Sequence, residues 1–389
     1  MYFPLSVDQS TMDKSQISRI HSLDALRGLA AFWVLLAHSL GSAEGIVSIT
    51  SLWYRLTPVR YLLSGEFPVI FFFVLSGFVL ARQLLHQRSI IYFDFSIRRI
   101  CRIYLPYAVS VLVAWVLANL IGTALVVGAS ENINADWMGS TSGEALLRHL
   151  LMLGRREDTN LNGVAWSLVV EMRVSLIFPV LMMFFTCSRW AIAVCGLTPV
   201  SAYFLANMIG QSPPFFFGST IILSFIVNVY FFLPFVVGMS IAQYIDPWDG
   251  NFSPIASGAI VFLAMLGILF VMRIPSHLVQ DLLYSIIGGI LIVIALKSKG
   301  LGKILEYAIF QWLGRISYSL YLFHVIVLNA LFKGLNQFIE LPVLAIVAVP
   351  LSLLIAEIAN RLIEQPAARL GRALSSGGSK TVTSPTWSS

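Results

Sequence analysis

Long runs of apolar residues, separated by Pro, Gly and charged residues, dominate the chain. About 20 apolar residues in a helix cross about 30 Å of hydrocarbon, so each run predicts a membrane-crossing helix. The predicted helices lie near residues 24–41, 68–85, 104–127, 164–186, 190–209, 218–244, 254–272, 279–297, 308–332 and 342–364. The run at 218–244 is long enough to tilt or break. The pattern therefore predicts an all-α, polytopic integral membrane protein with about ten transmembrane helices.

Composition excludes several other classes of protein. Hydrophobic residues make up 58% of the 389 residues and charged residues only 11%, less than half the charged share of an ordinary soluble domain. The formal charge of +6 comes from basic residues in the loops, where orientation in the membrane explains them, so no nucleic-acid partner is expected. Three cysteines imply no disulfide framework, and no His or Cys cluster has metal-ligand spacing. We expect no metal and no bound cofactor.

Lys and Arg in the loops predict the orientation, because cytosolic loops carry the excess of these residues. The richer set of loops holds Lys14, Arg19, Arg82, Arg88, Arg98, Arg99, Arg102, Arg189, Lys297, Lys299, Lys303, Arg361, Arg369 and Arg372. The opposite set holds Arg55, Arg60, Arg148, Arg155, Arg156, Arg273 and Lys333. Both termini are therefore expected in the cytosol. The loops 42–67 and 128–163 then face outward, where an external acceptor can dock.

A single membrane domain is expected over residues 22–372. Residues 1–21 form a polar, cytosolic N-terminal segment without the apolar core of a secretory signal. Residues 373–389 are polar and have too little apolar surface to offset the entropy of ordering, so a disordered cytosolic tail is expected.

Arg27 and His38 are the ionisable residues of the first helix. They are eleven residues apart, about three helical turns, so they share one face at opposite ends. A helix that enters from the cytosol near Asp24 places His38 about 21 Å deep, in the outer half of the bilayer. His38 is a candidate general base. The alternative is that Arg27 is a topogenic anchor and His38 an interhelical hydrogen-bonding residue.

Three arginines, Arg98, Arg99 and Arg102, follow the second helix on a predicted helical turn. Like charges so close repel one another unless an anion neutralises them. Phosphates suit this arrangement, because the planar guanidinium group binds their oxygens in a bidentate manner. Orientation by positive charge is the alternative explanation.

Glu171 lies near the outer end of the fourth helix, with Ser167 one turn before it on the same face. A carboxylate in a membrane helix needs a partner, and His38 is the preferred one because the two have similar predicted depth. A structural ion pair or a wet vestibule is the alternative. Trp166 is either a substrate-binding residue or a member of the interfacial aromatic belt.

The helix near 308–332 carries Ser317, Tyr321 and His324 on one stripe, at steps of four and three residues. Taken alone, this stripe favours helix packing; together with the other motifs, Tyr321 and His324 are candidate substrate- or donor-binding residues. In the second helix, Ser76 and Gly77 interrupt a run of aromatic residues, which predicts close approach by another helix.

In order along the chain, LDALRGLAAFWVLLAH, FFFVLSGFVLAR, RRICRIYLP, WSLVVE, LGRISYSLYLFH and IEQPA resemble motifs of the acyltransferase 3 family. That family includes bacterial O-antigen and exopolysaccharide O-acetyltransferases, and the resemblance covers about residues 22–372. It implies that His38 is catalytic, that Arg27 is the basic residue preceding it, and that Arg98 and Arg102 bind an acyl-CoA donor. Many relatives carry an extra external domain, whereas here the loops or a partner protein must position the acceptor.

The resulting hypothesis is an acyltransferase of the bacterial inner membrane. Its co-substrate is cytosolic acyl-CoA, with acetyl-CoA expected, and its acceptor is an extracytoplasmic or membrane-associated hydroxyl, with a saccharide expected. His38 deprotonates the acceptor and Glu171 orients the imidazole, although a covalent acyl-enzyme is equally compatible. Ser76, Ser167 or Tyr321 could donate to the developing oxyanion. A proton-coupled transporter or flippase is the alternative, with His38 and Glu171 relaying protons and the arginines gating an anionic solute.

Overall fold

The structure is a computed structural model of the chain. It describes residues 14–42, 64–85, 91–139, 141–187, 194, 196–210, 220–246, 248 and 250–376. Within these residues the secondary structure is helical, without strands. This agrees with the all-α class predicted from the periodicity of apolar positions.

Nine segments of the described residues are long and apolar enough to cross a membrane. They are formed by α1 (Lys14–Gly41), α5 (Glu66–Leu85), α6 (Tyr92–Ile121), α9 (Ala165–Cys187), α12 (Ile221–Tyr230) with α13 (Phe232–Tyr244), α14 (Pro254–Val271), α15 (His277–Lys297), α17 (Ala308–Leu335), and α18 (Leu341–Ala359) with its continuation. The remaining predicted helix, near 190–209, lies partly outside the described residues, and its described part contains α11 (Thr198–Met208). The helix α1 begins ten residues before its predicted start at 24.

Two of the spans are interrupted. The run 218–244, predicted to be long enough to tilt or break, is interrupted at Phe231, between α12 and α13. Pro234 explains its position, since proline has no N–H to donate to the carbonyl group of Tyr230. At the other end of the chain, α18 passes through a π-helical turn, η2 (Asn360–Glu364), into α19 (Gln365–Ser376). Residues 373–376 of the predicted disordered tail are thus helical, and residues 377–389 lie outside the described part.

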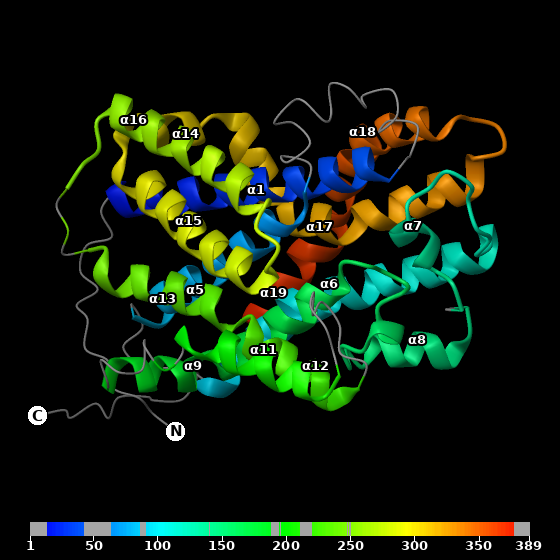
Figure 1. The fold of residues 1–389 in the computed structure, drawn as a ribbon, viewed down its shortest axis with the longest axis horizontal. Helices are drawn as coiled ribbons and strands as arrows, with labels where there is room; N and C mark the ends of the chain where they lie inside the picture. Colours follow the sequence, from blue (N-terminus) through cyan, green and yellow to red (C-terminus); the bar gives the residue numbers. More distant parts are fainter. Residues whose placement is uncertain are drawn as a thin grey trace, which may run out of the picture.

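Short helices form the segment between α6 and α9. They are α7 (Glu131–Ala135), α8 (Gly143–Leu150) and the 3-10 helix η1 (Arg156–Asp158), and a further short helix, α16 (Lys299–Leu305), joins α15 to α17. Serine side chains cap both α7 and α8, with Ser130 accepting from the N–H of Ile133 and Ser142 from that of Ala145. In Figure 1, α7 and α8 lie at the end of the bundle where α6 and α17 finish.

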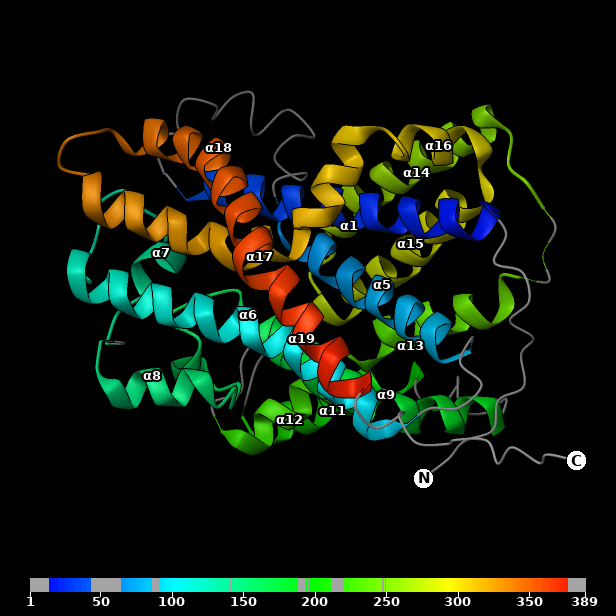
Figure 2. The same cartoon turned by 180° about the vertical axis from the view of Figure 1, so that it is seen from behind.

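The long helices pack into one bundle with α1, α5 and α17 at its centre (Figure 1). The first of these packs along α17, and α5 packs along α13. Viewed from behind, α19 lies along α6 and carries the last described part of the chain across the bundle (Figure 2). Residues from the beginning, middle and end of the sequence therefore meet around α1.

Glycines allow the closest helix crossings. A Cβ atom on Gly77 would overlap the backbone of Phe235, and one on Gly238 would overlap the backbone of Val74, so α5 and α13 touch backbone to backbone. The close approach predicted at Gly77 is thereby confirmed. Similarly, a Cβ atom on Gly28 would overlap Gly314, which fixes the crossing of α1 and α17.

Replacing Gly314 with Ala should therefore destabilise the bundle. The added Cβ atom meets the backbone of Asp24, which cannot rotate away, and overpacking of this kind costs about 1–3 kcal/mol. Thermal unfolding in detergent measures the effect. Gly334→Ala is the matched control on the same helix, because its Cβ atom would lie 3.5 Å from Ile121, an ordinary contact. Equal unfolding temperatures for the two variants would contradict the crossing.

Candidate active site

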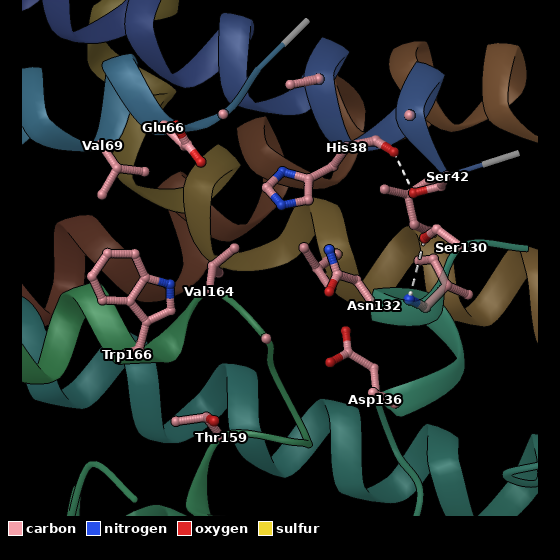
Figure 3. Close-up of a pocket in the computed structure, with 18 of the residues that line it drawn as sticks. His38, Ser42, Glu66, Val69, Ser130, Asn132, Asp136, Thr159, Val164 and Trp166 are labelled. Carbon is pink, nitrogen blue, oxygen red and sulfur yellow. Dashed lines mark hydrogen bonds between the residues drawn. The ribbon is translucent and has the colours of Figure 1, made fainter. Parts of the chain in front are cut away.

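The larger of two neighbouring pockets, here called the His38 pocket, has a volume of about 400 Å³. It is walled by α1, α5, the segment 130–136, the segment 159–166, α15 and α17. Figure 3 shows His38, Glu66, Asp136 and Trp166 around this space. The described residues that line it are Ala37, His38, Gly41, Ser42, Gly65, Glu66, Val69, Ile70, Ser130, Asn132, Ile133, Ala135, Asp136, Thr159, Asn160, Gly163, Val164, Trp166, Asp281, Tyr321, Val325 and Leu328.

His38 is held on the last turns of α1 by one of its ring nitrogens. Its Nδ1 lies 3.0 Å from the carbonyl oxygen of Val34, one turn earlier on the helix. The same Nδ1 lies 3.3 Å from Nε2 of His324 on α17, and the two ring centroids are 5.0 Å apart. His324 is completely buried, and its Nδ1 lies 3.0 Å from the carbonyl oxygen of Leu320. The histidine partner of His38 was not predicted from the sequence.

The smaller pocket, here called the arginine pocket, has a volume of about 70 Å³. Three arginines line it, Arg27 from α1 together with Arg99 and Arg102 from α6. The other described residues around it are Val69, Phe72, Phe73, Ser76, Val79, Ile103, Ser167, Leu168, Glu171, Ser317, Tyr318 and Tyr321. Arg27 and His38 thus belong to the same helix but line different pockets.

The predicted arginine cluster divides into two parts. Arg99 is buried, with its guanidinium carbon 5.7 Å from the centroid of the Phe95 ring, and it lines the arginine pocket with Arg102. Arg98 does not line the pocket, and its Nε donates to the carbonyl oxygen of Asp94 at 3.2 Å. The spacing of three residues between Arg99 and Arg102 places both on one face of α6.

Glu171 lines the arginine pocket and does not contact His38. Its Oε1 accepts a hydrogen bond from Ser76 Oγ at 2.9 Å, and the three arginines lie around the same pocket. Along α9, Glu171 lies five residues beyond Trp166, which lines the His38 pocket, so it is about 7.5 Å away along the helix axis. The contact predicted between His38 and Glu171 is therefore not formed. Helix periodicity correctly placed Glu171 on the same face as Ser167, since both line the arginine pocket, but the predicted depth of Glu171 in the membrane does not bring it to His38.

Val69 and Tyr321 line both pockets and so stand at their junction. The Tyr321 hydroxyl lies 2.7 Å from Ser167 Oγ, and Ser167 donates to the carbonyl oxygen of Val164 at 3.0 Å. Because the Ser167 hydroxyl donates its one proton to the Val164 carbonyl oxygen, the Tyr321 hydroxyl must be the donor to Ser167 Oγ. The protons of Ser76, Ser167 and Tyr321 thus all have acceptors, which leaves none of the three as a ready oxyanion donor. The stripe predicted on α17 connects the pockets, with Ser317 in one and Tyr321 in both.

Comparison with known proteins identifies the family of the chain. Residues 20–359 match the acyltransferase domain family Acyl_transf_3. The chain belongs to this family. It is also 27% identical over 318 residues to the "Exopolysaccharide production protein ExoZ" of Rhizobium meliloti (strain 1021), a match that covers 79% of this chain and 91% of that protein. No solved structure matches the chain.

The two pockets therefore belong to a multi-pass membrane acyltransferase. The match spans every long helix from α1 to α18, and so includes His38 and the arginine pocket.

Three carboxyl groups of the acyltransferase line the His38 pocket and were not predicted from the sequence. Glu66 begins α5, Asp136 follows α7, and Asp281 lies in α15, where its Oδ2 accepts from the Tyr230 hydroxyl at 2.7 Å. Asp281 had a usable signal, since it interrupts an apolar run. The sequence carried no such signal for Asp136, because acidic residues are common in polar loops and nothing in the sequence shows that this loop folds into the bundle.

Asp136 is buried beside Asn329 of α17. Burial raises the pKa of its carboxyl to about 7, against the opposing effect of Asn329 Nδ2, which donates to Oδ2 at 2.9 Å. An unfolded aspartate has a pKa of about 3.9, so the folded protein binds one more proton than the unfolded chain between these two values. The contribution of Asp136 to the free energy of unfolding therefore falls as pH rises from about 4 to about 7 and is constant above.

Asp136→Asn should remove this pH dependence. At pH 5 the variant and the natural protein should have similar stability, whereas at pH 8 the variant should be more stable by a few kcal/mol at most, because each tenfold change in proton affinity corresponds to about 1.4 kcal/mol. Thermal unfolding in detergent at both pH values measures the difference. Glu131→Gln, at an exposed position in the first turn of α7, is the control and should be unaffected. An identical difference at both pH values would show that Asp136 is ionised throughout.

Proposed function

We propose that this protein transfers an acyl group, with acetyl expected, from cytosolic acyl-CoA to a hydroxyl group of a saccharide in the His38 pocket. The observation that carries the proposal is the pair of adjoining pockets, one lined by three arginines and the other by a histidine. Asp24, which pairs with Arg27 at 3.0 Å, and Glu171, which lines the pocket, together offset two of the three positive charges of Arg27, Arg99 and Arg102. An anionic ligand supplies the remaining negative charge.

Acyl-CoA fits the arginine pocket by chemistry and by size. Guanidinium groups bind phosphate oxygens in bidentate pairs, and three of them suit a ligand with several phosphates. The pocket is small, at about 70 Å³, which favours a thin chain such as a pantetheine arm over a bulky solute. In this proposal the phosphates stay at the cytosolic end, and the thioester passes Val69 and Tyr321 to reach His38.

A saccharide acceptor fits the His38 pocket. The carboxyl groups of Glu66, Asp136 and Asp281 can form hydrogen bonds with sugar hydroxyls, and Trp166 offers an aromatic face. The described lining contains three carboxyl groups and no Lys or Arg, so the pocket disfavours an anionic acceptor. The similarity to a protein named for exopolysaccharide production supports a polysaccharide or its precursor.

The chemistry that this arrangement supports is general-base catalysis. Nε2 of His38 removes the proton from the acceptor hydroxyl, whose oxygen forms a bond to the thioester carbonyl carbon. The tetrahedral intermediate collapses, the carbon–sulfur bond breaks, and the CoA thiolate leaves. The proton on His38 then passes to the thiolate, so that ester and CoA thiol are the products and His38 is again neutral.

The proposal is tested with purified protein in detergent, [¹⁴C]acetyl-CoA and a neutral oligosaccharide. We expect acetylated saccharide and free CoA thiol to form in equal amounts, with both products absent when either substrate is omitted. A transporter moves its solute unchanged, so binding of either substrate without ester formation would favour that alternative. Cytosolic termini complete the proposal on the grounds of the loop charges, and the bacterial inner membrane on the grounds of the similarity to a bacterial protein.

A further inference from the structure

Two histidines from opposite ends of the sequence meet beside the larger pocket. His38 Nδ1 and His324 Nε2 are 3.3 Å apart, and both residues belong to helices whose crossing is fixed by glycine. His38 lies ten residues beyond Gly28, and His324 ten residues beyond Gly314. Ten residues of helix measure about 15 Å on each helix. The closely packed pair α1 and α17 therefore brings the imidazoles to the same level, and the contact follows from helix geometry rather than from a flexible side chain.

The hydrogen bonds determine which nitrogen of each ring carries a proton. A carbonyl oxygen only accepts, so His324 Nδ1, 3.0 Å from the Leu320 oxygen, is the protonated nitrogen of that ring. Its Nε2 in the neutral form has a lone pair, which faces His38. His38 Nδ1 in turn lies between two acceptors, the oxygen of Val34 and Nε2 of His324, so it also carries the proton. This leaves Nε2 of His38 unprotonated and able to act as a base.

We infer that His324 is a positioning residue that holds His38 in the base-competent tautomer, with Nε2 bare toward the acceptor. The inference rests on the proposed function of His38. It assigns to a neutral imidazole the task that a carboxylate performs in many hydrolytic sites. A neutral partner is suited to this position, because His324 is completely buried and a carboxylate there would be costly to desolvate.

His324 also acts during the reaction step. When Nε2 of His38 takes the acceptor proton, the ring becomes an imidazolium, and its Nδ1–H donates more strongly to the lone pair of His324 Nε2. The proton on Nδ1 stays on His38 throughout. Once the CoA thiolate has taken the proton from Nε2, the neutral pair is restored. The Tyr321 ring also packs near His324, with the two ring centroids 5.9 Å apart.

Substitution of His324 with Gln or Asn tests its two hydrogen bonds separately, the one to the Leu320 carbonyl oxygen and the one to His38 Nδ1. The amide oxygen of Gln reaches the former position of Nε2 and can still accept from His38, whereas the amide of Asn reaches only the position of Nδ1 and Leu320. We expect His324→Asn to lower kcat about 10- to 100-fold, with the KM values for acetyl-CoA and saccharide within about twofold. His324→Gln should retain most of the kcat. A purely structural role would affect Gln and Asn alike, or would raise both KM values.

A double variant distinguishes failure of this inference from failure of the proposed function. If His324 acts only through His38, His38→Ala/His324→Asn should be no slower than His38→Ala. Full activity of His38→Ala would overturn the proposed function itself. Loss of activity in His38→Ala together with normal kcat in His324→Asn would overturn the positioning role alone.

The tautomer can be measured without changing His324. The chain has six histidines, so a ¹⁵N-histidine NMR spectrum of the intact protein is simple, and the signal missing in His38→Ala assigns His38. We expect neutral His38 to carry its proton on Nδ1, the tautomer that free imidazole disfavours in water. A proton on Nε2 would overturn the inference even if the position 324 variants fail to fold.

Discussion

His38→Ala should reduce kcat/KM for acyl transfer by about a hundredfold to ten thousandfold, the range that a positioned general base contributes. The expectation follows from the position of the ring. His38 is the described histidine that lines the His38 pocket, and its Nδ1 is tied to Val34 and His324, so its other nitrogen is available to an acceptor. The donor's KM should change little, because the arginines that bind it in our proposal lie in the other pocket.

The matched control for this variant is His21→Ala. His21 lies on the same helix but is exposed and lines neither pocket. Initial rates with labelled acetyl-CoA and saccharide measure both variants, after thermal unfolding has shown that each is folded. A His38→Ala enzyme within about threefold of the natural rate would remove His38 from the chemistry.

Arg99→Ala/Arg102→Ala should raise the KM for acyl-CoA by about a hundredfold or more. Each guanidinium group that loses a charged hydrogen bond costs about 1.5–3 kcal/mol of donor binding, which is about 10- to 150-fold. The kcat at saturating donor should fall far less, since neither arginine lines the His38 pocket. Higher salt should weaken donor binding in the natural protein and have less effect in the variant.

Arg98→Ala is the control for this pair, and it also tests the family resemblance. The resemblance ties Arg98 and Arg102 to the donor, whereas the structure places Arg99 and Arg102 in the arginine pocket and directs Arg98 Nε to the Asp94 carbonyl. We expect Arg98→Ala to change the KM by less than about threefold. A larger effect from Arg98 than from Arg99 would show that the donor's phosphates bind along the other face of α6.

The sequence was informative wherever a property depended on one helix alone. Apolar runs predicted the spans, the possibility of a tilt or break in the run 218–244 and the glycine approach at Gly77, because each of these follows from local composition. Placing Arg27 and His38 on one helix face also required only the helical repeat. These features needed no knowledge of how the helices cross.

Contacts between helices were harder to predict, because they depend on relative depth. Glu171 and His38 have similar predicted depths, yet in the structure they line two different pockets. Glu171 accepts a hydrogen bond from Ser76 instead. The true partner, His324, is brought level with His38 by the crossing at Gly28 and Gly314. The equal ten-residue spacings from Gly28 to His38 and from Gly314 to His324 predict that alignment only once the crossing of the two glycines is known.

The central claim is that the acyl group passes through the protein, from the arginine pocket to the His38 pocket, by way of the junction at Val69 and Tyr321. Proteoliposomes with a neutral oligosaccharide sealed inside and [¹⁴C]acetyl-CoA outside test it directly, since neither substrate crosses a lipid bilayer unaided. Our account predicts labelled saccharide inside the vesicles, formed by the natural protein and lost in His38→Ala. Label that appears only when donor and acceptor share a compartment would contradict it.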